Sequence, residues 1–129
     1  MIVKTQFLIA VLAIALLFPY GVIPAEELDD GDWRRGRIYY RTTCTDCHKQ
    51  MTGEGISPAS RTIAEWSAYF DTDRHDQSGK TNSAVSYYTS REYRESVRAG
   101  NRVADKLIDL SDEELLKDVR AFLVHGASD

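Results

Sequence analysis

Residues 44 to 48 read Cys-Thr-Asp-Cys-His, and they contain both cysteines of this 129-residue chain. On a helical turn, Cys44 and Cys47 are neighbours on one face, and His48 follows directly. A disulfide across two intervening residues closes a very short loop, so it removes little entropy from the unfolded chain and stabilises the fold little. The motif therefore indicates chemistry at this point of the chain more than a structural bridge.

Apart from a chance match, three kinds of site use two cysteines at this spacing. A redox-active dithiol of the thioredoxin kind belongs to a fold with strands, and the chain shows no convincing strand pattern. A zinc site needs four ligands, and the histidines are not spaced as a pair. The sequence C-x-x-C-H is the attachment motif for haem, in which two thiols bind the porphyrin and the histidine binds the iron. We expect one covalently attached haem c, held by Cys44 and Cys47, with His48 as an iron ligand.

The chain also resembles the small class I c-type cytochromes over most of residues 33–124. Gly36, Tyr40 and Cys44 match the G-x-x-x-[FY]-x-x-x-C pattern of that family's first helix, where the glycine permits close crossing by the C-terminal helix. Residues 110–114, followed by an apolar stripe, look like the family's last helix. The resemblance implies an all-α, cytochrome c-like fold of about four helices around one haem.

Helix signals in the sequence agree with that expectation. Trp33, Gly36, Tyr40 and Cys44 fall on one helical stripe. Three capping boxes mark further helix starts, namely Thr62 with Glu65, Thr89 with Glu92, and Ser111 with Glu114. The second of these helices is expected to stop at Gly100, and the last to run from residue 112 to a point before Gly126. Residues 71–86 are polar and read as a loop.

Two features near the motif leave alternatives open. Pro58 either lies beside His48, as a proline does in the family, or only forms the turn before the next helix. Six aromatic residues can wall a haem or simply fill the core; they are Trp66, Tyr69, Phe70, Tyr87, Tyr88 and Tyr93.

The sixth iron ligand is where the chain departs from the family. Class I cytochromes usually carry a methionine ahead of the last helix, and no methionine lies there. Met51 is three residues past His48, too close to reach the opposite face of the porphyrin. The remaining candidates are His75, His125 and an open iron. We predict His75, because a polar loop can place it over the far face, whereas the end of the last helix points His125 away. The acidic neighbours of His75 argue mildly against ligation, since they favour its protonated form.

The N-terminus reads as a secretory signal. Residues 7–25 carry no charge and follow Lys4, which predicts a signal peptide over 1–25, cleaved after Ala25. The alternative is an uncleaved membrane anchor, but Pro19 and Gly21 would interrupt a spanning helix. Residues 26–32 are then a flexible, acidic mature N-terminus, and residues 33–129 one cytochrome c domain. We expect a periplasmic protein, which would be attached to the membrane only if residues 1–25 are retained as an anchor.

The charge of the chain indicates which kinds of partner it can bind. The formal net charge is −4, so the chain lacks the excess of basic residues that binding to the phosphates of nucleic acid requires. An exposed set of cations can be a solvated helix face or a ring that steers an acidic partner; they are Arg34, Arg35, Arg37, Arg41 and Lys49.

Function depends on the sixth ligand. With His48 and His75 both bound, no substrate reaches the iron, and we expect a one-electron carrier, not an enzyme, that meets redox partner proteins transiently. Its potential should be low, because Met/His ligation is the arrangement that raises it. The alternative is a five-coordinate haem c that binds a small gas or peroxide, as sensor or enzyme, with His75, Arg98 or Arg102 above the iron. A third possibility is a haem subunit of a larger, anchored complex.

Overall fold

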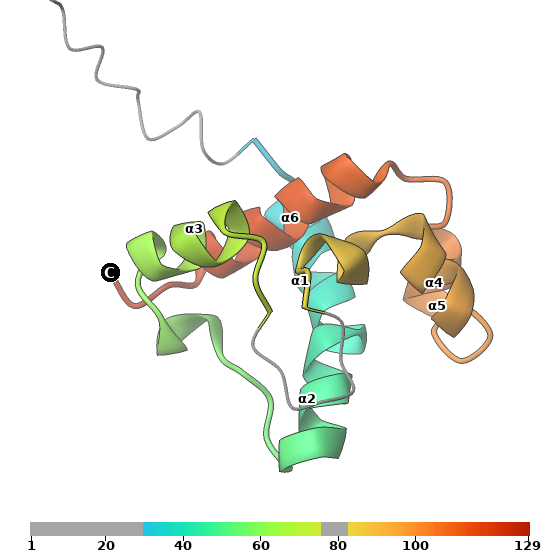
Figure 1. Cartoon of the computed structure of the whole chain (residues 1–129), viewed down its shortest axis with the longest axis horizontal. Coiled ribbons are helices and arrows are strands. Elements are labelled where there is room, and N and C mark those ends of the chain that lie inside the picture. The colour runs from blue at the N-terminus through green and yellow to red at the C-terminus, as the bar shows by residue number, and fades with distance from the viewer. Residues whose placement is uncertain (1–29, 76–82) are drawn as a thin grey trace, which may run out of the picture.

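The computed structural model describes residues 30–75 and 83–129, and within them every regular element is a helix (Figure 1). In chain order these are α1 (Trp33–Thr42), α2 (Cys44–Thr52), the 3-10 helix η2 (Pro58–Ser60), α3 (Ile63–Asp71), the 3-10 helix η3 (Ser86–Thr89), α4 (Arg91–Val97), α5 (Arg102–Lys106) and α6 (Asp112–His125). The all-α prediction is confirmed. None of the described helices combines the length and apolar character needed to cross a membrane. The expected signal peptide over 1–25, its cleavage site and residues 26–29 lie outside the described residues, as do residues 76–82 of the polar loop.

Helix α6 is the centre of the fold, because α1 and α3 both pack against it (Figure 1). The crossing with α1 is very close: a Cβ atom added at Gly36 would overlap the carbonyl group of Asp118. The Asp118 carboxylate is 1% exposed and accepts hydrogen bonds from the backbone N–H of Asp32, at 2.7 Å, and from Nε of Arg35, at 2.5 Å. The glycine thus lets the two helices touch, and a buried carboxylate fixes their register.

The described end of the acidic N-terminal segment is held by α6. Asp30 pairs with Lys117 at 3.3 Å, and the Asp32 side chain caps α1 by accepting from the backbone N–H groups of Arg34 and Arg35. Residues 26–32 were expected to be a flexible, solvated segment. Of this segment the structure describes residues 30–32, which make the contacts given above.

Two of the three predicted capping signals start helices where expected. At α3 the box is complete, because Thr62 N–H donates to Glu65 at 2.8 Å and Glu65 N–H donates to the Thr62 hydroxyl at 3.2 Å. At α6 the Ser111 hydroxyl accepts from Glu114 N–H at 3.2 Å. The Glu114 carboxylate pairs with Arg35 at 2.6 Å, so this box is only half formed.

The third signal was misplaced by one residue. The N-cap of α4 is Ser90, whose hydroxyl accepts from Tyr93 N–H at 3.1 Å. Thr89 ends η3 and its hydroxyl donates to the Ser86 carbonyl at 3.1 Å. Helix α4 also ends at Val97, before Gly100. The two adjacent hydroxyl residues offered two possible caps, and the preceding 3-10 turn selected the second.

The sequence did not predict the break between α1 and α2 or the helix α5, and Asn101 explains both. Its Nδ2 donates to the Thr42 carbonyl and the Thr43 hydroxyl, each at 3.0 Å. Its Oδ1 accepts from the N–H groups of Val103 and Ala104 and so caps α5. One amide therefore ties the start of α5 to the residue that precedes Cys44.

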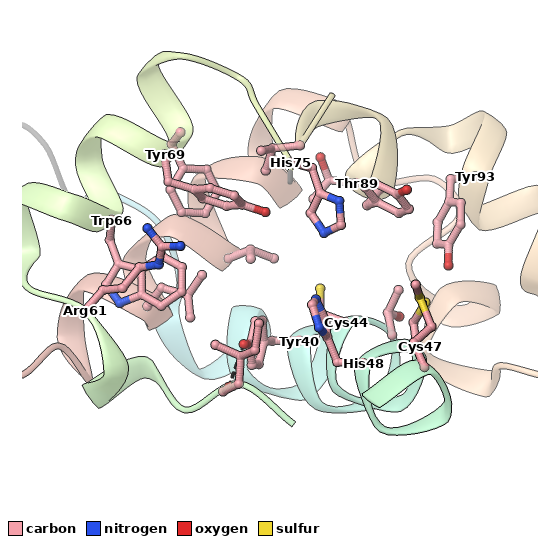
Figure 2. Close-up of a pocket in the computed structure, with 18 of the residues that line it drawn as sticks. Tyr40, Cys44, Cys47, His48, Arg61, Trp66, Tyr69, His75, Thr89 and Tyr93 are labelled. Atoms are coloured by element: carbon pink, nitrogen blue, oxygen red, sulfur yellow. Dashed lines mark hydrogen bonds between the residues drawn. The ribbon is translucent and has the colours of Figure 1, made fainter. Parts of the chain in front are cut away.

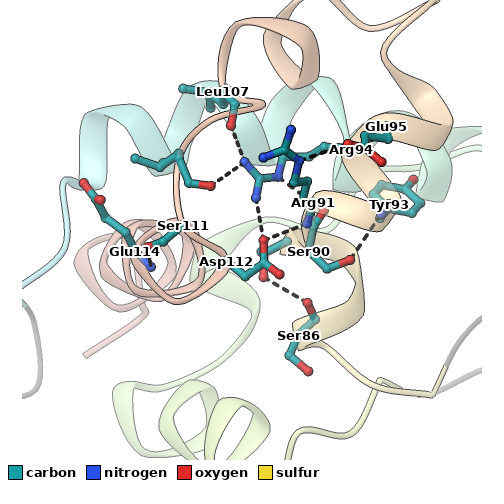
Figure 3. A network of polar contacts seen from close by, with 12 residues as sticks. Ser86, Ser90, Arg91, Tyr93, Arg94, Glu95, Leu107, Ser111, Asp112 and Glu114 are labelled. Atoms are coloured by element: carbon teal, nitrogen blue, oxygen red, sulfur yellow. Dashed lines mark hydrogen bonds and ion pairs between the residues drawn. The ribbon is translucent and has the colours of Figure 1, made fainter.

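Arg94 is fully buried and joins α4 to the start of α6 (Figure 3). Its Nη2 pairs with Asp112 at 2.6 Å, and its Nη1 donates to the carbonyl groups of Leu110, at 2.9 Å, and of Leu107. Its Nε donates to the Ser90 carbonyl at 3.2 Å. A guanidinium has five donors in a planar fork, so a single side chain can satisfy this set of backbone acceptors.

The hydrophobic core runs along α6 and borders an apolar cavity. Its buried members come from α1, α3, α6 and the segment ahead of η3; they are Tyr39, Tyr40, Trp66, Phe70, Val85, Leu115, Val119 and Leu123.

Candidate functional site

The cavity lies between α2 on one side and α3, η3, His75 and Val85 on the other (Figure 2). Its empty volume is about 1210 Å³, which includes its opening to solvent, and its lining is mostly apolar. All four predicted site residues line it: Cys44, Cys47, His48 and His75. The fold thus brings Cys44 and His75, which are 31 positions apart in the chain, to the wall of one cavity.

Helix α2 presents the motif to the cavity. It begins at Cys44, directly after the break at Thr43, and it ends at Gly53, which adopts a left-handed conformation with φ 83°. Burial raises the pKa of the Cys44 thiol to about 12, and the neighbouring Cys47 adds to this shift. Reactive dithiols have a lowered pKa, because the thiolate is the nucleophile. The environment of Cys44 is therefore unlike that of a redox-active dithiol.

His75 faces His48 across the cavity. Figure 2 shows the two rings pointing toward one another from opposite sides, and their centres lie 5.9 Å apart with the planes inclined by 65°. Tyr88 packs against the His75 ring at 4.9 Å, and Tyr69 lies 6.4 Å from it, both measured between ring centres. The structure therefore brings together the two histidines that the sequence analysis selected as iron ligands.

The other sulfur and imidazole candidates lie elsewhere. His125 stacks on Trp33 at 4.3 Å, with the planes inclined by 13°, and does not line the cavity. Met51 lines the cavity from α2, the helix that carries His48, and its sulfur is 3.8 Å from that of Cys47. Met51 is thus on the His48 side, as its position in the chain requires.

The two arginines considered as groups above an open iron are not at the cavity. Arg98 pairs with Asp105 at 2.6 Å on the surface. Arg102 is exposed at the start of α5, and neither side chain lines the cavity. Among the described residues, His75 faces His48 from the opposite wall of the cavity.

Pro58 belongs to the turn before α3. It begins η2, and its carbonyl accepts a hydrogen bond from Nε1 of Trp66 at 2.7 Å. Pro58 does not line the cavity. Of the two interpretations of this proline, the structure supports the turn.

Aromatic side chains form much of the cavity wall. Five of the six aromatic candidates line it, namely Trp66, Tyr69, Phe70, Tyr88 and Tyr93. Tyr87 instead contacts Tyr88 and Tyr93, at 5.3 Å and 5.5 Å between ring centres. Burial raises the pKa of Tyr93 to about 12, so its phenol is neutral at physiological pH.

Sequence reasoning missed Arg61 and Ile56. Arg61 contributes a guanidinium to the cavity wall and lies over the Trp66 ring at 5.4 Å. Ile56 lines the cavity, and its carbonyl accepts a hydrogen bond from the Tyr40 hydroxyl at 2.7 Å. Neither residue belongs to a motif, because both lie in the irregular segments around η2, whose path depends on tertiary packing.

The exposed cations are fewer than the sequence suggested. Arg35 turns toward α6, where it pairs with Asp118 and Glu114. The others stay exposed on α1 and α2; they are Arg34, Arg37, Arg41 and Lys49.

Comparison with protein-family models, curated proteins and solved structures found no significant match. Within residues 30–75 and 83–129, no group of three or more His, Cys, Asp or Glu side chains is arranged to hold a metal ion.

Proposed function

We propose that this protein is a class I-like monohaem c-type cytochrome that carries one electron at a time, with the iron held between His48 and His75. The facing of these two rings across the cavity is the observation that carries the proposal. A metal–imidazole bond of about 2 Å, added to roughly 1.2 Å from nitrogen to ring centre, would separate the centres of two imidazoles on opposite sides of one iron by roughly 6.4 Å. The ring centres of His48 and His75 lie 5.9 Å apart, so the present spacing is slightly shorter than a bound iron would require.

The covalent part of the site fits the same group. Cys44 and Cys47 are free thiols on one side of the cavity, next to His48 on the same helix. The break at Thr43, fixed by Asn101, sets the direction in which α2 presents all three side chains. Two thioether bonds and one axial imidazole would thus come from a single short helix.

The walls suit a large, flat and mainly apolar group with an acidic edge. They are rich in aromatic side chains, which exclude water, and Arg61 places a cation at the wall that can neutralise a carboxylate. Haem supplies one-electron chemistry when bound, and the protein tunes it through axial ligands and burial. Two histidine ligands leave no position for a substrate, which favours a carrier of low potential over an enzyme.

The proposed carrier acts in the periplasm, where it meets redox partner proteins transiently. The exposed cations on α1 and α2 support an acidic partner surface, since opposite charges speed encounter. If the N-terminal segment is retained, the same domain is held at a membrane.

Covalent attachment is the step to test first. The chain is produced with its N-terminal segment in a host that matures c-type cytochromes, and its mass and pyridine haemochrome spectrum are recorded. We expect the mass of one haem to survive denaturation, and Cys47→Ala to shift the α band to longer wavelength because one vinyl group stays unsaturated. Met51→Ala, on the same helix, should leave the spectrum unchanged. A wild-type protein without covalent haem would refute the proposal.

A further inference from the structure

His75 is not on a helix, so something else must hold it. It follows α3 by four residues and precedes the segment 76–82. Its backbone N–H donates to the Ser83 carbonyl at 2.8 Å, which joins the two ends of that segment. A second and stronger connection lies two residues earlier, at Asp73.

The Asp73 carboxylate binds the start of η3 with both oxygens. Oδ1 accepts from Ser86 N–H and Oδ2 accepts from the Ser86 hydroxyl, each at 2.7 Å. Hydrogen bonds to an ionised carboxylate are stronger than those between neutral groups. Asp73 also has φ 48°, in the left-handed region that aspartate tolerates better than most residues.

The same contact connects His75 to the wall on which its ring packs. Ser86 begins η3, which carries Tyr88, and the Tyr88 ring lies 4.9 Å from that of His75. The Tyr88 carbonyl in turn accepts the hydroxyl of the buried Tyr39, on α1, at 2.6 Å. A continuous set of contacts therefore runs from α1 through η3 and Asp73 to the segment that carries His75.

We propose that Asp73 is the positioning residue for His75: by binding Ser86 with both carboxylate oxygens, it holds the proposed sixth ligand opposite His48. This inference rests on the proposed function. Asp73 touches neither the cavity nor His48, so its effect on the iron passes through the position of His75.

The test is the rate at which the reduced holoprotein binds carbon monoxide, which would depend on how readily His75 moves away if His75 closes the site. Asp73→Gly removes the carboxylate and keeps a residue that adopts positive φ freely. We expect binding to be faster by roughly threefold, because both hydrogen bonds are exposed to solvent, which weakens the interaction of a charged group. Ser86→Ala removes one of the two hydrogen bonds and should speed binding by a smaller factor in the same direction. Asp73→Asn, which retains one acceptor oxygen, should fall between wild type and Asp73→Gly.

Asp71→Asn is the matched control, because Asp71 pairs with Arg120 at 2.8 Å and lies only two residues from Asp73. Its carbon monoxide rate should equal that of wild type. If Asp73→Gly and Ser86→Ala lower the melting temperature but bind carbon monoxide at the wild-type rate, the positioning role is refuted and Asp73 is only structural. If wild type already binds carbon monoxide as fast as His75→Ala, then His75 does not close the site, and both the proposed bis-histidine ligation and this inference are refuted.

Discussion

A Cβ atom built on Gly36 would overlap the backbone carbonyl of Asp118, so no side chain fits between the two helices at this point. This contact sets the angle and distance at which α1 and α6 cross. Helix α2 follows α1 after the break at Thr43 and lines the cavity. The orientation of Cys44, Cys47 and His48 therefore depends on a glycine one helix away.

Replacing that glycine should destabilise the fold. Gly36→Ala would push a methyl group into a backbone carbonyl that cannot move without shifting α6. We expect the free energy of unfolding to fall by about 3 kcal/mol, measured by chemical denaturation. Gly100→Ala is the control, because no atom lies within 4 Å of a Cβ built there. Equal stability of the two variants would contradict the close crossing.

Arg94 should contribute more to stability than any exposed arginine. Arg94→Met keeps the volume but leaves the Leu107 and Leu110 carbonyl groups without their donor, at a cost of about 3 kcal/mol. Arg91→Ala removes an exposed pair with Glu95 and should leave stability almost unchanged, because exposed ion pairs contribute little. Denaturation of both variants tests this, and a near-neutral Arg94→Met would mean that the buried network stabilises little.

The capping box of α3 should make stability depend on pH. Hydrogen bonds from the Thr62 backbone N–H lower the pKa of Glu65 from its ordinary value of 4.5. A lowered pKa in the folded state contributes stability above the unfolded value, and this is lost as pH falls through the folded value. Glu65→Gln should therefore be less stable than wild type at pH 7, and the two should converge below the folded pKa. A difference that does not change with pH would show that the charge is irrelevant.

Local signals predicted local structure well. The caps at Thr62 and Ser111 depend on neighbours within three residues, so the sequence alone located both helix starts. The shift from Thr89 to Ser90 shows the limit, because two adjacent hydroxyl groups both satisfy the pattern. The network of Arg94 could not be predicted, since its acceptors are backbone carbonyls brought near by tertiary packing.

The residues of the candidate site likewise fall into those that a local motif predicts and those that only tertiary packing places there. Cys44, Cys47 and His48 are adjacent in the sequence, so the motif identified them directly. His75 was reached by elimination, and its position depends on Asp73, whose contact with Ser86 spans 13 residues. Arg61 carried no signal, because an arginine in an irregular segment reads as a solvated side chain.

The angle between the two histidine rings predicts a spectroscopic signature. The planes of His48 and His75 are inclined by 65°, far from parallel. If the two rings kept this inclination while both held a haem iron, they would act on different iron d orbitals and keep these close in energy, which would give a strongly anisotropic low-spin ferric EPR signal. We expect such a signal, with a large maximum g value, in the oxidised holoprotein. An ordinary rhombic spectrum would indicate rings that are nearly parallel when the iron is bound.

Whether the iron is closed by His75 is tested most directly by absorption and EPR spectra of wild type, His75→Ala and His125→Ala, each also reduced under carbon monoxide. His125 serves as the control because it stacks on Trp33, away from the cavity. Wild type and His125→Ala should be low-spin and slow to bind carbon monoxide, whereas His75→Ala should be high-spin and bind it at once. A wild-type protein that is already high-spin and takes up carbon monoxide as fast as His75→Ala would contradict a bis-histidine electron carrier and direct attention to gas or peroxide chemistry.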